Sequence, residues 1–142
     1  MPPAESNLLV PGDAKALVVL DLDNDNWPDF VVTRNNDTTL AFRNQGAAGR
    51  HSLQVNLQGL AGNPTAVGAR LTVELTDGST QTAEVYAGSG YYSQSTAACF
   101  FGYSDANPPR QIRVRWPSGK TTQHPFPPAS TSLTLSARGL DQ

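Results

Sequence analysis

The chain has 142 residues, of which 15% are charged, and its formal net charge is −2. This length is sufficient for one domain with a sizeable core, and the single cysteine excludes an internal disulfide and a multi-cysteine zinc site. The weak charge provides no basic surface for nucleic acid and no polybasic segment for a membrane surface, so we expect neither partner. The 12 Gly and 11 Pro, without any sustained helical period, indicate an all-β protein.

Residues 1–14 are rich in proline and predict an irregular lead-in. The segment lacks the charged and apolar regions of a signal peptide, and no run in the chain is long enough to insert into a membrane. Two alternatives stay open. Either a signal segment belongs to a longer chain from which this one is cut, or the protein is cytoplasmic.

Short β-branched and aliphatic runs predict strands at about 15–21, 29–34 and 38–43, which together form a β-meander. The small, flexible residues 44–50 then separate two halves. In the second half apolar and polar residues alternate, a hairpin turn is expected at Asp77-Gly78, and at least eight strands in total predict a β-sandwich or barrel-like domain. The predicted core is Leu17, Val19, Phe30, Val32, Leu53, Val55, Leu71, Val73, Val85, Phe101, Ile112, Val114, Trp116, Leu133 and Leu135.

The loop between the first two predicted strands carries four carboxylates at relative positions 1, 3, 5 and 9. Oxygen donors at alternating loop positions are typical of calcium sites, and the expected ligands are the side chains of Asp21, Asp23, Asp25 and Asp29 with the backbone carbonyl of Trp27. Strands flank the loop and position 12 is not Glu, so a strand-loop-strand calcium site is expected instead of an EF-hand. The alternative is a solvated acidic turn without a metal.

Four motifs in the second half resemble the ASPIC/UnbV domain, which is named after an acidic protein of cartilage and a protein of enediyne biosynthesis. They are Gly68-Ala-Arg70, Gly88-Ser-Gly-Tyr91 with Ser93-Gln-Ser95, Phe101-Gly102 and Val114-Arg-Trp-Pro-Ser-Gly119. The acidic loop with the following Phe42-Arg-Asn44 resembles one FG-GAP or VCBS repeat of integrin-type propellers. The resemblance implies a calcium-binding repeat at 15–46 and an ASPIC/UnbV-like β domain at 50–138, packed together as one unit. A single repeat cannot close a propeller.

The resemblance implies an extracellular or cell-surface module for adhesion or ligand binding that is not an enzyme. Aromatic residues near polar loops suit sugars, so the expected partner is a polysaccharide or an extracellular protein. The expected ligand-binding residues are Tyr91, Tyr92 and Gln94, because an extended segment would place one ring in the core and offer the other to solvent beside an amide. In a competing interpretation both rings pack inward.

Two other functions stay open. The chain is then either a structural cap of a larger propeller, which would self-associate when separated from it, or a glycan-active enzyme that uses the clustered aspartates as acid and base. The enzyme is less favoured, because a bound metal would hold those carboxylates ionised and occupied. Outside a larger propeller we expect a monomer.

Overall fold

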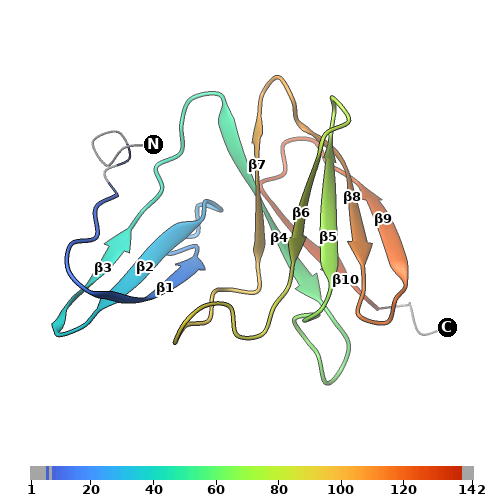
Figure 1. The fold of residues 1–142 in the computed structure, drawn as a ribbon. Helices are drawn as coiled ribbons and strands as arrows, with labels where there is room; N and C mark the ends of the chain where they lie inside the picture. Colours follow the sequence, from blue (N-terminus) through green and yellow to red (C-terminus); the bar gives the residue numbers. More distant parts are fainter. Residues whose placement is uncertain (1–5, 7, 139–142) are drawn as a thin grey trace.

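The computed structural model describes residues 6 and 8–138, and its ten named elements are all β-strands, arranged in three sheets. The all-β prediction is therefore confirmed. Residues 1–5 and 7 of the predicted lead-in lie outside the described residues. Among those described, no helix has the length and hydropathy to cross a membrane. Figure 1 shows a small N-terminal sheet beside a larger two-sheet body.

The N-terminal sheet is the predicted meander. Strands β1 (Ala14–Leu20), β2 (Asp29–Arg34) and β3 (Asp37–Phe42) pair antiparallel in that order, and their bounds lie within about one residue of those expected. The acidic loop connects β1 to β2. The β1–β2 and β2–β3 registers place Leu17, Val32 and Leu40 side by side.

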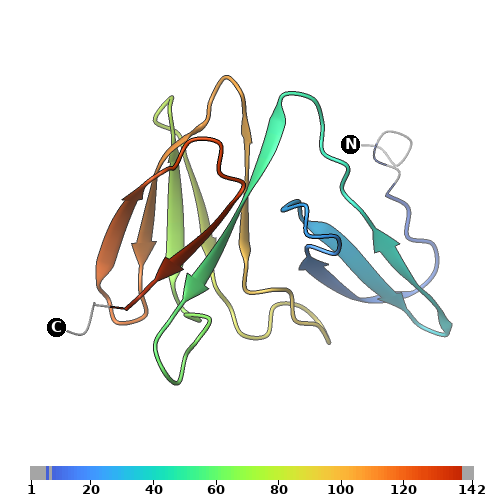
Figure 2. The same ribbon diagram turned by 180° about the vertical axis from the view of Figure 1, so that it is seen from behind.

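The second half is a sandwich of two sheets, and Figures 1 and 2 show the meander beside its β4 and β7 strands. One sheet has the order β10-β4-β7, and the other has the order β6-β5-β8-β9. β10 runs parallel to β4, while every other pair in this half is antiparallel. The strands are β4 (Arg50–Gln58), β5 (Arg70–Leu75), β6 (Thr80–Glu84), β7 (Cys99–Ser104), β8 (Pro109–Arg115), β9 (Thr121–Pro125) and β10 (Ser132–Ser136).

The main core lies between the two sheets of the sandwich, where alternating side chains of facing strands meet. Of the predicted core residues, those from Leu53 to Trp116 are all buried, while Leu133 and Leu135 are half-buried against them. Cys99 is buried in this core, which raises the pKa of its thiol to about 11. The buried cluster is Leu53, Val55, Leu57, Ala66, Ala69, Leu71, Val73, Leu75, Val85, Cys99, Phe101, Ile112, Val114, Trp116 and Ala137.

The meander does not contribute to this cluster, so its predicted core residues need correction. Val32 is buried within the meander itself, Val19 and Phe30 are half-buried, and Leu17 is 47% exposed. Leu17 lies on β1, an edge strand of a sheet with only three strands, where few neighbours cover a side chain. The prediction that Leu17 is a core residue is therefore wrong.

The two halves meet through hydrogen bonds at the edge of β1. The Val19 N–H donates to the Ser95 hydroxyl (3.0 Å), and the Val19 carbonyl accepts from the Thr96 N–H (3.0 Å). Farther along, the Asn26 amide donates to the Thr131 hydroxyl (3.3 Å). In the part of the chain that the structure describes, the halves therefore contact each other through polar groups and do not share the main buried cluster.

The loop after β4 turns so tightly at Gly59 that a methyl group has no room there. A Cβ on Gly59 would lie 2.1 Å from the Asn63 carbonyl oxygen, whereas one on Gly102, in β7, would meet no atom within 4 Å. We expect Gly59→Ala to lower the free energy of unfolding by about 1–3 kcal/mol, the range for overpacked sites. Gly102→Ala is the matched control and should be neutral or slightly stabilising, because alanine restricts the unfolded chain. Urea unfolding of both variants checks this, and equal midpoints would contradict it.

Candidate functional site

The acidic loop folds around the carboxylate of Asp21. Asp21 Oδ1 accepts the Asp25 N–H (3.1 Å) and Oδ2 accepts the Asn26 N–H (3.0 Å), while Asp25 Oδ1 accepts the Trp27 N–H (2.8 Å). Asn24 and Asn26 adopt left-handed backbone angles, with φ of 60° and 68°. Asparagine tolerates this conformation better than other side chains, so the sequence favours the tight turn.

Asp29, the first residue of β2, anchors this loop to the rest of the meander. Its side chain is fully buried, at 0% exposure. One carboxylate oxygen accepts the Leu22 N–H (2.8 Å) and the other accepts the Asn44 N–H (2.7 Å), which follows β3. A single carboxylate thus fixes the start of the loop and the exit of the meander.

The structure brings three of the four predicted side-chain ligands together. One carboxylate oxygen each from Asp21, Asp23 and Asp29 lie within 4.8 Å of one another. The Arg43 guanidinium contacts Asp23 at 3.0 Å, so the group of three acids and one base carries an excess of two negative charges. Asp25 is not part of the group, and one of its carboxylate oxygens accepts the Trp27 N–H.

These donors fit Ca²⁺, which takes six to eight oxygen ligands at about 2.3–2.6 Å, so that two ligands on opposite sides of one ion lie about 5 Å apart. The oxygen separations within 4.8 Å meet this condition. The backbone hydrogen bonds do not exhaust the carboxylates, because each oxygen has two lone pairs. Asp21, Asp23 and Asp29 could therefore hold the ion, while the role of the Trp27 carbonyl stays a prediction.

The segment after β3 supports the acidic loop, a role that the sequence patterns did not predict. Besides the bonds from Arg43 and Asn44, Gly46 lies under the Trp27 ring, where a Cβ would come within 3.0 Å of a ring carbon. The signal was present only as the Phe42-Arg-Asn44 resemblance. The physical role of this segment is to tie the exit of β3 to the acidic loop.

The predicted arrangement of Tyr91 and Tyr92 is wrong in both of its versions. Both rings are exposed, at 69% and 86%, and they contact each other edge to face with centroids 4.5 Å apart. The segment is not extended, because Tyr92 has a φ of 50° and Gly90 a φ of 111°. Side chains in such a turn do not alternate between core and solvent.

Gln94 closes this turn instead of presenting its amide to solvent. Its side-chain carbonyl accepts the Gly88 N–H, and its amide donates to the Tyr86 carbonyl (3.4 Å). The three residues predicted to bind ligand therefore divide into an exposed ring pair and an amide engaged within the loop.

A comparison with known protein families identifies the family to which the sandwich is similar. The family model described as ASPIC and UnbV matches residues 59–140, more than half of the chain. This chain belongs to the ASPIC and UnbV family. No curated protein matched it. The match does not extend over 15–46, so the likeness of the acidic segment to an FG-GAP or VCBS repeat rests on its own residues.

Three motifs of the ASPIC and UnbV domain form turns and strand ends in the sandwich. Gly68 has a φ of 88° and donates its N–H to the Val85 carbonyl just before β5. Phe101-Gly102 lies in β7, and the segment 114–119 ends β8 and turns into β9 through Gly119, whose φ is 84°. β9 itself was not predicted, because its sequence Thr-Thr-Gln-His-Pro has no apolar alternation.

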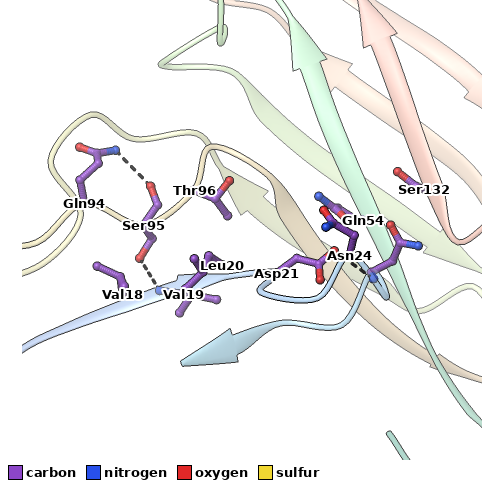
Figure 3. Close-up of a pocket in the computed structure, with 11 residues that line it drawn as sticks. Val18, Val19, Leu20, Asp21, Asn24, Gln54, Gln94, Ser95, Thr96 and Ser132 are labelled. Atoms are coloured by element: carbon purple, nitrogen blue, oxygen red, sulfur yellow. Dashed lines mark hydrogen bonds between the residues drawn. The ribbon is translucent and has the colours of Figure 1, made fainter. Parts of the chain in front are cut away.

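A cleft of about 580 Å³ lies between the acidic loop and the sandwich of this ASPIC and UnbV chain, and Figure 3 shows its lining. Asp21 belongs both to the acid group and to the cleft. Asn24, Gln54 and Ser132 lie toward the same end of the cleft (Figure 3). The lining residues are Val18, Val19, Leu20, Asp21, Asn24, Asn26, Gln54, Gln94, Ser95, Thr96 and Ser132.

A second polar cluster joins residues that are isolated in the sequence. His51 Nε2 lies 2.5 Å from Asp105 Oδ1, and the His51 ring stacks on Tyr103 with centroids 5.1 Å apart. Burial and then the charge of Asp105 raise the pKa of the Tyr103 hydroxyl. His51 lies in β4 and pairs directly with Tyr103 of β7, so sheet packing accounts for this cluster.

The buried bonds of Asp29 can be tested with a matched pair of charge-removing variants. Asp29→Asn leaves one of two backbone N–H groups facing an amide NH₂, so we expect a loss of about 1–3 kcal/mol in the free energy of unfolding. Asp25→Asn removes a charge from the same loop but keeps the oxygen that its single bond uses, so it should change stability by less than about 0.5 kcal/mol. Urea unfolding in chelator measures both. A loss that is the same for both variants would contradict the anchoring role of Asp29.

Proposed function

We propose that this chain is a non-catalytic, calcium-stabilised β module that binds a ligand or mediates adhesion outside the cell. The observation that carries the proposal is the group of Asp21, Asp23 and Asp29, whose carboxylate oxygens lie within 4.8 Å of one another. In this proposal the acidic segment is an FG-GAP or VCBS-like repeat attached to the ASPIC and UnbV domain.

Electrostatics favours a divalent cation at this position. Two unit charges 4.8 Å apart, the upper limit of these separations, repel by roughly 3.5 kcal/mol at an effective dielectric constant of about 20. Arg43 contacts Asp23, while Asp29 is fully buried, where a charge without a partner is costly. Arg43 therefore offsets part of the repulsion, and a doubly charged cation would offset the remainder.

In this proposal Asp21, Asp23 and Asp29 hold the ion, and the Asp25 side chain and the Trp27 carbonyl are the further ligands expected from the spacing. Bound Ca²⁺ would supply charge neutralisation and a cross-link among oxygen ligands. The backbone bonds of Asp21 and Asp29 hold their oxygens in place beforehand. An affinity on the order of 10⁻⁴ to 10⁻³ M is expected for an extracellular module.

A second candidate, an assembly or capping role, is supported by the apolar face of the meander. Leu17, 47% exposed, lies in register with Val32 and Leu40 on a sheet of only three strands. Apolar faces of this kind mark contact surfaces. Size-exclusion chromatography at several concentrations tests the role: self-association reversed by Leu17→Ser would support it, and a monomer at every concentration would contradict it.

Calcium binding can be tested by calorimetric titration and by melting in calcium and in chelator. We expect Ca²⁺ at about 100 times its dissociation constant to stabilise the fold by about 2.7 kcal/mol. Asp23→Asn should remove most of this effect without loosening the loop, because among the described residues the Asp23 carboxylate accepts no backbone N–H. Asp13→Asn is the control, because Asp13 lies just before β1, in a surface ion pair with Lys15. An unchanged melting temperature in chelator, with no metal by native mass spectrometry, would contradict the proposal.

A further inference from the structure

We propose that the cleft between the acidic loop and the sandwich binds a neutral oligosaccharide, and that this binding depends on calcium through Asp21. The inference rests on the proposed function, and it moves the ligand site from the exposed tyrosines to the cleft. Its volume of about 580 Å³ lies within the range of about 300–1,000 Å³ of small-molecule sites.

One end of the cleft carries polar side chains without partners. Among the described residues, the side chains of Asn24, Gln54 and Ser132 make no hydrogen bond, although all three line the cleft beside Asp21. They come from the acidic loop, β4 and β10, and Figure 3 shows them toward the same end as Asp21. Two amides and one hydroxyl supply both donors and acceptors, which is what a sugar hydroxyl requires because it donates and accepts at once.

The floor and the far end of the cleft have a different chemistry. Val18 and Leu20 point to one side of β1 and Val19 to the other, and Ser95 and Thr96 lie across the cleft from these residues (Figure 3). A pyranose ring has C–H faces and a hydroxyl rim, so the aliphatic carbons of Val18 and Leu20 beside polar side chains match its surface. Ser95 already accepts the Val19 N–H, and its hydroxyl can still donate.

The charge of the lining selects against ionic ligands. Asp21 is the one charged residue among the lining side chains, and it adjoins Asp23 and Asp29. Because bound Ca²⁺ would neutralise this group, the lining would offer neither a cation to pair with an anionic ligand nor an excess negative charge to pair with a cationic one. A neutral, hydroxyl-rich ligand satisfies the free amides and the free hydroxyl without introducing a buried, unpaired charge.

The dependence of ligand binding on calcium follows from Asp21, which belongs both to the acid group and to the cleft lining. Asp21 accepts backbone N–H groups of the acidic loop, and Asn24 lies within that loop. Removing a cation leaves the repulsion among three carboxylates to act on the loop that positions Asp21 and Asn24 in the cleft. Chelation should therefore weaken ligand binding as well as metal binding.

Affinity electrophoresis tests the proposal, with dextran, laminarin, galactomannan and xyloglucan each dissolved in native gels containing calcium or chelator. We expect at least one polysaccharide to retard the protein in calcium, and chelator to reverse the retardation. Gln54→Ala and Ser132→Ala should each weaken binding about 5- to 10-fold, which corresponds to one hydrogen bond. Gln58→Ala is the matched control, because Gln58 lies on the same strand, outside the cleft lining.

Calorimetric calcium titration of the same variants separates this inference from the proposed function. Gln54→Ala should bind calcium like the wild type, since Gln54 is not in the acid group. If calcium binds but no polysaccharide retards the protein, or Gln54→Ala is retarded like the wild type, the cleft proposal fails alone. Retardation abolished by Tyr92→Ala and not by Gln54→Ala would return the site to the tyrosine pair. If calcium does not bind, the proposed function fails with it.

Discussion

The carboxylate of Asp29 joins the parts of the N-terminal half on which the proposed site depends. It is fully buried, and its two oxygens accept backbone N–H groups from Leu22, at the start of the acidic loop, and Asn44, after β3. A neutral side chain of the same shape cannot accept both bonds. The fold therefore needs a buried negative charge at this position, within 4.8 Å of Asp21 and Asp23. The conflict between this backbone requirement and like-charge repulsion is what a divalent cation would resolve.

The separation of the two halves creates the cleft. The sandwich has its own buried cluster, to which the meander contributes no residue, and the halves meet at the β1 edge and at the Asn26–Thr131 bond. Because these contacts lie apart from one another, a polar space remains between them. Asp21 borders that space and belongs to the acid group, so a cation held by the acids would also act on the lining of the cleft.

The features predicted from the sequence were those determined by neighbouring residues. Runs of β-branched and aliphatic residues located the three meander strands, and the residues predicted as core between Leu53 and Trp116 are buried. The exposure of Leu17 depends on how many strands surround β1, and the exposure of Tyr91 and Tyr92 depends on a left-handed turn that glycine permits but does not require. The cleft joins residues more than 100 positions apart, such as Asn26 and Ser132, so no local pattern could indicate it.

The central claim is that the acidic loop holds calcium between Asp21, Asp23 and Asp29. A crystal structure of the protein grown with calcium, with anomalous scattering used to locate the ion, tests this claim directly. The account predicts one ion with an oxygen from each of the three carboxylates at about 2.3–2.6 Å. Anomalous density absent from the loop, with Arg43 still paired to Asp23 and water among the three carboxylates, would contradict it.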